Sequence, residues 1–222
     1  MAAFWWLLQK DLVTEFRARQ SWPTMVLLGG VIAMVFGLQF DGLTETRQAL
    51  AGTMLWIATF FAAMTGLDRS FALERQDGCW ECLRSYPISS TTLYLAKFAS
   101  QALALALLQV VLTPLFIVLC HVAWQAPWWA TLLVAALGNV CLAAVGTMIG
   151  ALTSGMKHSG GLLVAVALPL TVPVLLAAAD ATRLMSAGQC DSAWWRWTNL
   201  LAVFAAIYLS AGAVLFEFVV ED

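Results

Sequence analysis

The chain has 222 residues, of which 62% are hydrophobic and 11% are charged, and its mean hydropathy is +0.84. Soluble domains carry about 25% charged residues, so this composition argues against a soluble enzyme and indicates an integral membrane protein. The net charge of −2 gives no support for nucleic-acid binding, and five cysteines without framework spacing argue against a disulfide scaffold.

The first predicted element is a helix at 4–20 that lies in the membrane interface. Trp5, Leu8, Leu12 and Phe16 recur at helical spacing, while polar and basic residues fill another face. The bases follow the first apolar residues and no small-residue cleavage site is seen, so we expect this segment to be retained.

Six apolar segments follow, and each is long enough to cross a bilayer at about 1.5 Å rise per residue. We expect spans at about 23–40, 49–67, 90–120, 130–152, 161–179 and 199–218. A hydroxyl of Ser89 or Ser90 is expected to cap the third span by accepting a backbone N–H of its first turn. The whole chain, 1–222, is therefore predicted to be one all-α transmembrane domain.

The lysines and arginines predict the orientation of these spans. Of the 11 bases, eight belong to the N-terminal segment and to the second and fourth links, and three belong to the links on the opposite side. Short links rich in lysine and arginine stay in the cytoplasm. We therefore expect both termini and the link at 68–89 to be cytoplasmic.

The link at 68–89 is the one strongly charged segment between the spans. Asp77 and Gly78 predict a turn between two short helical pieces. Glu81 and Arg84 can pair on one face while Leu83 presents apolar surface, an arrangement that suits a partner's groove. A solvated connector is the alternative. The candidate docking residues are Arg69, Glu74, Asp77, Gly78, Glu81, Leu83, Arg84 and Pro87.

Two segments superficially suggest catalytic or metal chemistry. In GALTSGMKHS, Met156 displaces Lys157 from the place that a phosphate-binding loop requires, so we expect no nucleotide hydrolysis by this chain. Cys79 and Cys82 have metal-ligand spacing but lack further ligands nearby, so we interpret them as packing residues. We assign no catalytic residue and no metal ligand.

His121 and Trp124 lie together near the predicted outer end of the third span. A histidine there could ligate haem iron, and the simpler interpretation is an interfacial residue that forms a hydrogen bond. The many tryptophans fall at span ends, where indole rings favour the headgroup region. Whether the outer tryptophans also hold a planar ligand stays open.

Within the spans, Gly146 and Gly150 form G-x-x-x-G, which permits close helix approach inside one subunit or between subunits. Pro169 and Pro173 should bend the fifth span because each lacks a backbone donor. No charged residue occupies a span centre, which disfavours an ion-coupled transporter. Several polar residues leave a polar route through the spans open, namely Gln101, Gln109, Thr113, Asn139 and Thr147.

The segment LDRSFALERQDGCWECLRSYPISSTTLYLAK resembles the cytoplasmic loop of type 2 ABC export permeases, and most closely that of the haem exporter protein B (CcmB) family. That loop commonly reads L-E-R-x-F, then D-G-x-x-E-x-L, then proline and a later lysine. The matching residues are Leu67, Arg69, Phe71, Asp77, Gly78, Glu81, Leu83, Pro87 and Lys97, with Asp68 where glutamate is usual. The run LPLTVPVLL at 168–176 resembles the same family's fifth span, and the likeness covers nearly the whole chain.

The resemblance implies a non-catalytic permease in the bacterial inner membrane, with a short cytoplasmic coupling helix that docks on a separate ATPase subunit. ATP would bind to that partner, and haem would be the cargo of the complex in cytochrome c maturation. Other haem-handling membrane subunits and a periplasmic haem chaperone would be further partners. Two alternatives stay open: a permease that exports a drug, lipid or polysaccharide, and an assembly or anchor subunit without a transport path.

Overall fold

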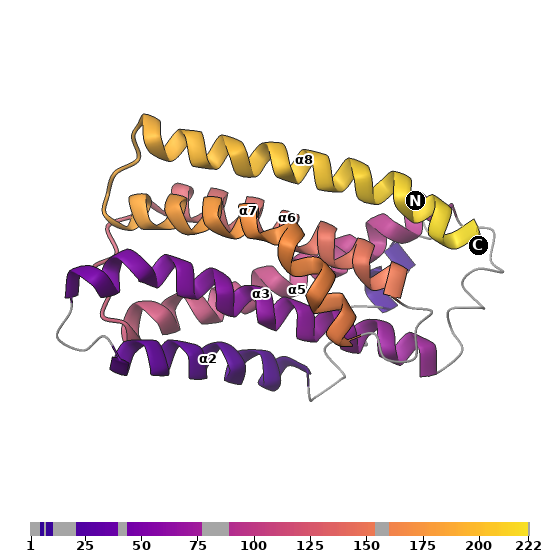
Figure 1. The fold of residues 1–222 in the computed structure, drawn as a ribbon, viewed down its shortest axis with the longest axis horizontal. Helices are drawn as coiled ribbons and strands as arrows, with labels where there is room; N and C mark the ends of the chain where they lie inside the picture. The colour runs from indigo at the N-terminus through magenta and orange to yellow at the C-terminus, as the bar shows by residue number, and fades with distance from the viewer. Residues whose placement is uncertain are drawn as a thin grey trace.

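Six long helices make up most of the described part of the chain (Figure 1). The structure, a computed structural model, describes residues 5, 6, 8–10, 21–39, 44–76, 89–153 and 160–221. The helices are α2 (Ser21–Gln39), α3 (Thr44–Gln76), α5 (Ser90–Leu119), α6 (Trp128–Thr153), α7 (Gly160–Ser186) and α8 (Ser192–Glu221). Residues 5, 6 and 8–10 are also helical and lie within the predicted interfacial helix at 4–20, of which 4, 7 and 11–20 lie outside the described residues.

The long helices coincide with the predicted spans. In the described residues, five helices are long and apolar enough to cross a membrane, so the prediction of an all-α, multi-span membrane protein is confirmed. The apolar part of α2, Pro23–Gln39, is shorter than these five. At about 1.5 Å per residue it measures about 25 Å, somewhat less than a hydrocarbon core of about 30 Å. A sixth span at α2 therefore stays a prediction.

Helices α3 and α6 form the centre of the bundle. Helix α6 packs against α3, α5, α7 and α8, and α3 packs against α2 and α7 as well. In Figure 1, α2 and α8 lie on opposite sides of these helices. Large apolar side chains stay exposed on the outer helices, for example Val35 of α2, Val110 of α5 and Val203 of α8. In a membrane protein such side chains face lipid, which costs nothing there.

Helix α7 contains both predicted bend residues, Pro169 and Pro173. Figure 1 shows that α7 changes direction in its N-terminal half, where both prolines lie. A proline leaves a preceding carbonyl without its usual donor, and in a membrane that carbonyl needs another partner. Pro173 cannot donate to the carbonyl of Pro169, and Tyr208 of α8 donates its hydroxyl to the next carbonyl, that of Leu170, at 2.7 Å. The bent segment is thus tied to α8.

Two turns, α5 to α6 and α7 to α8, lie at the same end of the bundle, which we call the turn end (Figure 1). The opposite end, where α3 ends and α5 begins, is the loop end. Helix α7 ends in a C-terminal cap of two nested backbone hydrogen bonds. Gly188 N–H donates to the Met185 carbonyl, and Gln189 N–H donates to the Leu184 carbonyl. Gly188 has a φ of 76°, which glycine adopts without strain.

Helix α5 ends in the same way, but with His121 in the glycine position. His121 N–H bonds to the Val118 carbonyl at 3.3 Å, and Val122 N–H bonds to the Ile117 carbonyl at 3.1 Å. His121 has a φ of 48°, which makes it the one described non-glycine residue with positive φ. Its backbone therefore terminates α5, whatever its side chain does.

Glycines allow the close approach of the central helices. A methyl group built on Gly146 would collide with the Leu67 side chain and would lie 3.5 Å from Met64 Cε, so Gly146 faces α3 of the same chain. Gly138, two turns earlier on α6, lies in the same way against the ring of Trp56. The predicted small-residue contact at Gly146 is thus used inside one subunit.

Candidate functional site

Helix α3 continues beyond its apolar part at the loop end. The span-like part of α3 runs from Thr46 to Leu67, but the helix continues to Gln76. Nine further residues at about 1.5 Å each carry the helix about 13 Å beyond the apolar part. The first part of the predicted docking link, with Arg69 and Glu74, is therefore a continuation of the span. It is not the separate helical piece that the sequence suggested.

The rest of the predicted docking link lies outside the described residues. This concerns Asp77, Gly78, Glu81, Leu83, Arg84 and Pro87. The predicted turn at Asp77 and Gly78, and the pairing of Glu81 with Arg84, therefore stay predictions.

Helix α5 begins directly after this link, at Ser90. Ser89 occupies the N-cap position with φ −64° and ψ 138°, but its hydroxyl does not accept a backbone N–H. It forms a hydrogen bond of 2.7 Å with the hydroxyl of Thr92 instead. The expected side-chain cap is therefore wrong, because the nearby hydroxyl competes for the Ser89 oxygen.

The first turns of α5 anchor the loop end in the bundle. Tyr94 is fully buried and lies against Phe216 of α8, with ring centroids 5.5 Å apart. Its hydroxyl contacts the position of Gly212, where a side chain would collide with it. Lys97 is also buried, with 6% of its surface exposed. Tyr94 therefore fills the space between the first turns of α5 and helix α8.

Tyr94 was not identified as a functional candidate from the sequence. Four of the five polar residues that were identified inside the spans lie in the core, and Thr113 is partly buried. Gln101 and Gln109 of α5, and Asn139 and Thr147 of α6, are each at most 5% exposed. Each has a side-chain nitrogen or oxygen atom without a hydrogen-bond partner. An unpaired buried polar group costs about 1–3 kcal/mol, so these groups call for a partner that the protein atoms do not supply.

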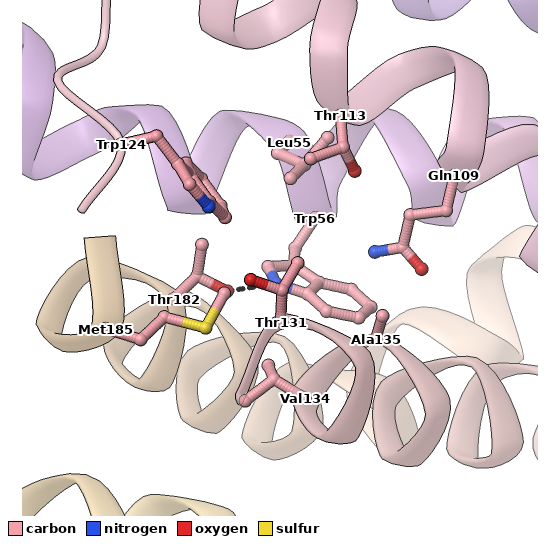
Figure 2. A pocket seen from close by; sticks show the side chains of 10 residues that line it. All are labelled: Leu55, Trp56, Gln109, Thr113, Trp124, Thr131, Val134, Ala135, Thr182 and Met185. Carbon is pink, nitrogen blue, oxygen red and sulfur yellow. Dashed lines mark hydrogen bonds between the residues drawn. The ribbon is translucent and has the colours of Figure 1, made fainter. Parts of the chain in front are cut away.

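Two small cavities lie in the turn-end half of the core, each with a volume of about 10 Å³. The inner cavity lies around Trp56 and is lined by the Gln109 amide and by threonine hydroxyls (Figure 2). Trp56 donates its indole N–H to the Thr182 hydroxyl at 2.9 Å. The outer cavity shares Thr113, Thr182 and two further lining residues with the inner one. A volume of 10–15 Å³ holds about one water molecule, so neither cavity has room for haem.

An open recess of about 380 Å³ lies beyond the outer cavity, at the turn end. The start of α3, the α5–α6 turn, the end of α7 and the α7–α8 turn contribute its polar groups. These are Gln48, Gln125, Arg183, Ser186 and Gln189. Val122 and Ser186 line both the recess and the outer cavity.

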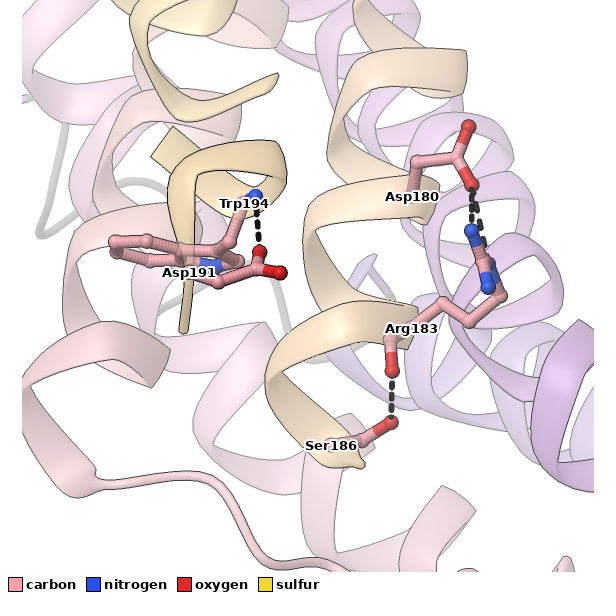
Figure 3. Close-up of polar contacts among 5 residues, drawn as sticks. All are labelled: Asp180, Arg183, Ser186, Asp191 and Trp194. Carbon is pink, nitrogen blue, oxygen red and sulfur yellow. Dashed lines mark hydrogen bonds and ion pairs between the residues drawn. The ribbon is translucent and has the colours of Figure 1, made fainter. Parts of the chain in front are cut away.

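Arg183 is held in place by Asp180 one turn earlier on α7 (Figure 3). The Nε and Nη2 atoms of Arg183 lie 3.1 Å and 3.0 Å from Asp180 Oδ1. Ser186 donates its hydroxyl to the Arg183 carbonyl at 2.9 Å. Because the pair is well exposed, it contributes little to stability.

The two residues considered as haem contacts lie differently. His121 is exposed at the end of α5, whereas Trp124 lines both cavities. In the part of the chain that the structure describes, no group of three or more histidine, cysteine or acidic side chains is placed to hold a metal ion. The structure thus gives His121 a backbone role and Trp124 a packing role.

The tryptophans at the turn end pack on one another. Trp194 is fully buried, and its ring meets those of Trp129 and Trp195 edge to face, with centroids 5.5 Å and 4.9 Å apart. Asp191 caps α8 by accepting the N–H groups of Ala193 and Trp194 at 3.0 Å and 3.2 Å (Figure 3 shows the second). Since the rings of Trp129 and Trp195 cover Trp194, this cluster is a packed corner.

Comparison with known proteins shows similarity to one family. The sequence pattern of the family described as "CcmB protein" matches residues 2–219. Heme exporter protein B of Rhodobacter capsulatus is 35% identical over 179 residues, which cover 80% of this chain and 81% of that protein. The proteins of the same name from Paracoccus denitrificans and Pseudomonas aeruginosa are 32% and 27% identical, over 69% and 90% of this chain and 69% and 89% of their own lengths.

Proposed function

Because this chain belongs to the CcmB family, we propose that it is the non-catalytic membrane permease subunit of a bacterial ABC complex for haem export in cytochrome c maturation. A separate ATPase subunit binds and hydrolyses ATP. The family match over residues 2–219 carries this proposal, since it covers the spans and the charged link together.

The charged link at 68–89 is the proposed docking element for the ATPase. Helix α3 supports this role because it carries the chain about 13 Å beyond its apolar part at the loop end. The buried start of α5 would provide a mechanical connection, since Tyr94 follows the link closely in the chain and lies against Phe216 of α8. Closure of the ATPase on nucleotide would thus shift α3 and α5 relative to α8.

The membrane location, the orientation and the partners of the chain follow from the same proposal. It lies in the bacterial inner membrane with both termini in the cytoplasm, so the turn end faces the periplasm. Other haem-handling membrane subunits and a periplasmic haem chaperone complete the complex, and haem is its cargo. The predicted sixth span at α2 and the interfacial helix at 4–20 belong to this arrangement.

The small size of the core cavities favours a second candidate, an assembly subunit with no haem path of its own. Each cavity holds about one water molecule. Haem would therefore need a path between this subunit and others, or a different conformation. The absorption spectrum of the purified subunit, compared with that of the whole complex, distinguishes the two candidates, because only a haem-carrying subunit retains the haem band alone.

The docking proposal is tested by replacing Asp77 or Glu81 with alanine and purifying the tagged protein from its native membrane. We expect each variant to recover less ATPase subunit and to support less cytochrome c production. Asp180→Ala is the matched control, because it removes an exposed acid at the opposite end of the bundle. Normal ATPase recovery with both link variants would refute the docking role. A wild-type protein that purifies with an ATPase but without haem-handling subunits would indicate a permease for a different cargo.

A further inference from the structure

Polar groups continue from the turn end of the bundle into its middle. The recess adjoins the outer cavity at Ser186, and the outer cavity adjoins the inner one at Thr113 and Thr182. The inner cavity reaches Gln109. Gln109 precedes Leu119, the last residue of α5, by ten positions, which corresponds to about 15 Å along the helix axis. That depth is about half of a hydrocarbon core of about 30 Å.

The lining groups of the inner cavity match the needs of a water molecule. The Gln109 side-chain nitrogen points toward Trp56, so its N–H groups can donate into the cavity (Figure 2). The Thr182 oxygen accepts the indole N–H of Trp56, so the Thr182 hydroxyl keeps its own proton to donate. Thr131 donates to the Pro127 carbonyl at 3.3 Å and keeps lone pairs that can accept. A buried water molecule uses two to four such partners, and here donors and acceptors are both at hand.

The outer cavity also offers donors and acceptors. Thr113 and Thr182 line it from α5 and α7, and Ser186 lines it from the end of α7. Ser186 donates to the Arg183 carbonyl, so its oxygen remains an acceptor. Cavities of this size stay empty when they are lined only by apolar groups, and this lining is mixed.

We propose that the turn-end half of the bundle holds a file of two water molecules, one in each cavity, that connects the recess to the Gln109 amide. The first water molecule bonds to the hydroxyls of Ser186, Thr113 and Thr182. The second bonds to Thr113 and to the Gln109 amide, which lie one helical turn apart on α5 (Figure 2). This file gives hydrogen-bond partners to the Gln109 N–H groups and to the threonine hydroxyls without any displacement of helices.

The water file gives the bundle a polar path of limited size. It admits water to the depth of Gln109, while each cavity is far too small for a cargo such as haem. The inference rests on the packing of α3, α5, α6 and α7 and does not depend on the proposed function.

Three buried methionines provide an internal test. Met185 lines the inner cavity and is 2% exposed. Met64 and Met25 are equally buried, at 1% and 2%, and line neither cavity. Irradiation of the full-length protein in lipid nanodiscs with a synchrotron beam splits water into hydroxyl radicals, which oxidise side chains next to bound water. Peptide mass spectrometry then measures the oxidation rate of each methionine.

We expect Met185 to be oxidised several-fold faster than Met64 and Met25, with the added oxygen taken from the solvent when the protein is equilibrated in water labelled with oxygen-18. Gln109→Leu removes the amide that holds the second water molecule and should lower the rate at Met185 toward that of Met64. Gln101→Leu makes the same change on α5 away from both cavities and should leave Met185 unaffected. Met64 serves as the monitor of folding, because its rate rises in a variant that loses its packing.

Equal oxidation rates of Met185 and Met64 in the wild-type protein would overturn the proposal. That comparison needs no variant, so it holds even if Gln109→Leu fails to fold. A folded Gln109→Leu protein with an undiminished rate at Met185 would likewise overturn the role of Gln109.

Discussion

Replacement of His121 with glycine separates a backbone role from a haem-binding role. His121 ends α5 with a φ of 48°, in the left-handed region that glycine adopts freely at the end of α7. The side chain of His121 is exposed. The backbone role therefore predicts that glycine is at least as good as histidine at this position.

The expected magnitude follows from the conformation. An L-residue in the left-handed region costs about 1–2 kcal/mol, and glycine removes this cost. Glycine also makes the unfolded chain more flexible, which costs about 0.4–1 kcal/mol. The net gain in the free energy of unfolding is about 0.5–1 kcal/mol. At about 2–4 °C per kcal/mol for a chain of this size, the melting temperature should rise by about 1–4 °C.

The assay is thermal unfolding of the purified protein in detergent, together with cytochrome c production in cells. His121→Ala is the matched control, because it removes the imidazole and keeps the strained backbone. We expect alanine to leave stability close to that of the wild type, and both variants to support cytochrome c production. A glycine variant that is no more stable than the alanine variant would refute the strain argument. Loss of cytochrome c production in both folded variants would establish a function for the imidazole.

Two further predictions concern α6 and the α7–α8 turn. Gly146→Val should lower the free energy of unfolding by about 1–3 kcal/mol, because the valine side chain must displace Leu67. Gly30→Val is the control, because a methyl group placed on Gly30 would lie 3.5 Å from Leu115, at an ordinary contact distance. Equal destabilisation by the two substitutions would contradict the close contact of α6 with α3. Burial and the Asp191 carboxylate raise the pKa of the Cys190 thiol above its ordinary value. Asp191→Asn keeps an oxygen for the N-cap and should lower the pKa of the Cys190 thiol, so that more thiolate is present at about pH 8 and Cys190 is alkylated faster. The alkylation rate is measured by peptide mass spectrometry. An unchanged alkylation rate would show that burial alone raises the pKa.

The helices could be predicted from the sequence because apolar segments of about 20 residues are long enough to cross a bilayer and must be helical there. Five of the predicted spans coincide with helices that fit a membrane. The ends were less predictable. Helix α7 continues to Ser186 and α8 begins at Ser192, beyond the predicted limits of 161–179 and 199–218, because Gly188 and Asp191 terminate and cap these helices outside the apolar segments.

The family, and with it the candidate docking link, could also be recognised in the sequence, because the charged motif between two spans is local. The role of His121 could not, since a left-handed backbone at the end of a helix leaves little trace in the residue type. The same holds for Tyr94, whose contacts with α8 join residues far apart in the chain.

The sequence by itself determined that the chain is a helical membrane protein and which family it belongs to, because hydrophobicity and a continuous motif are properties of neighbouring residues. Only the tertiary structure decided where the polar span residues point. Gln109, Thr113 and Thr182 come from two helices and line adjoining cavities, while Gly146 meets α3 of its own chain. These contacts depend on how the helices pack, and packing is set by side chains that meet across the bundle rather than along the chain.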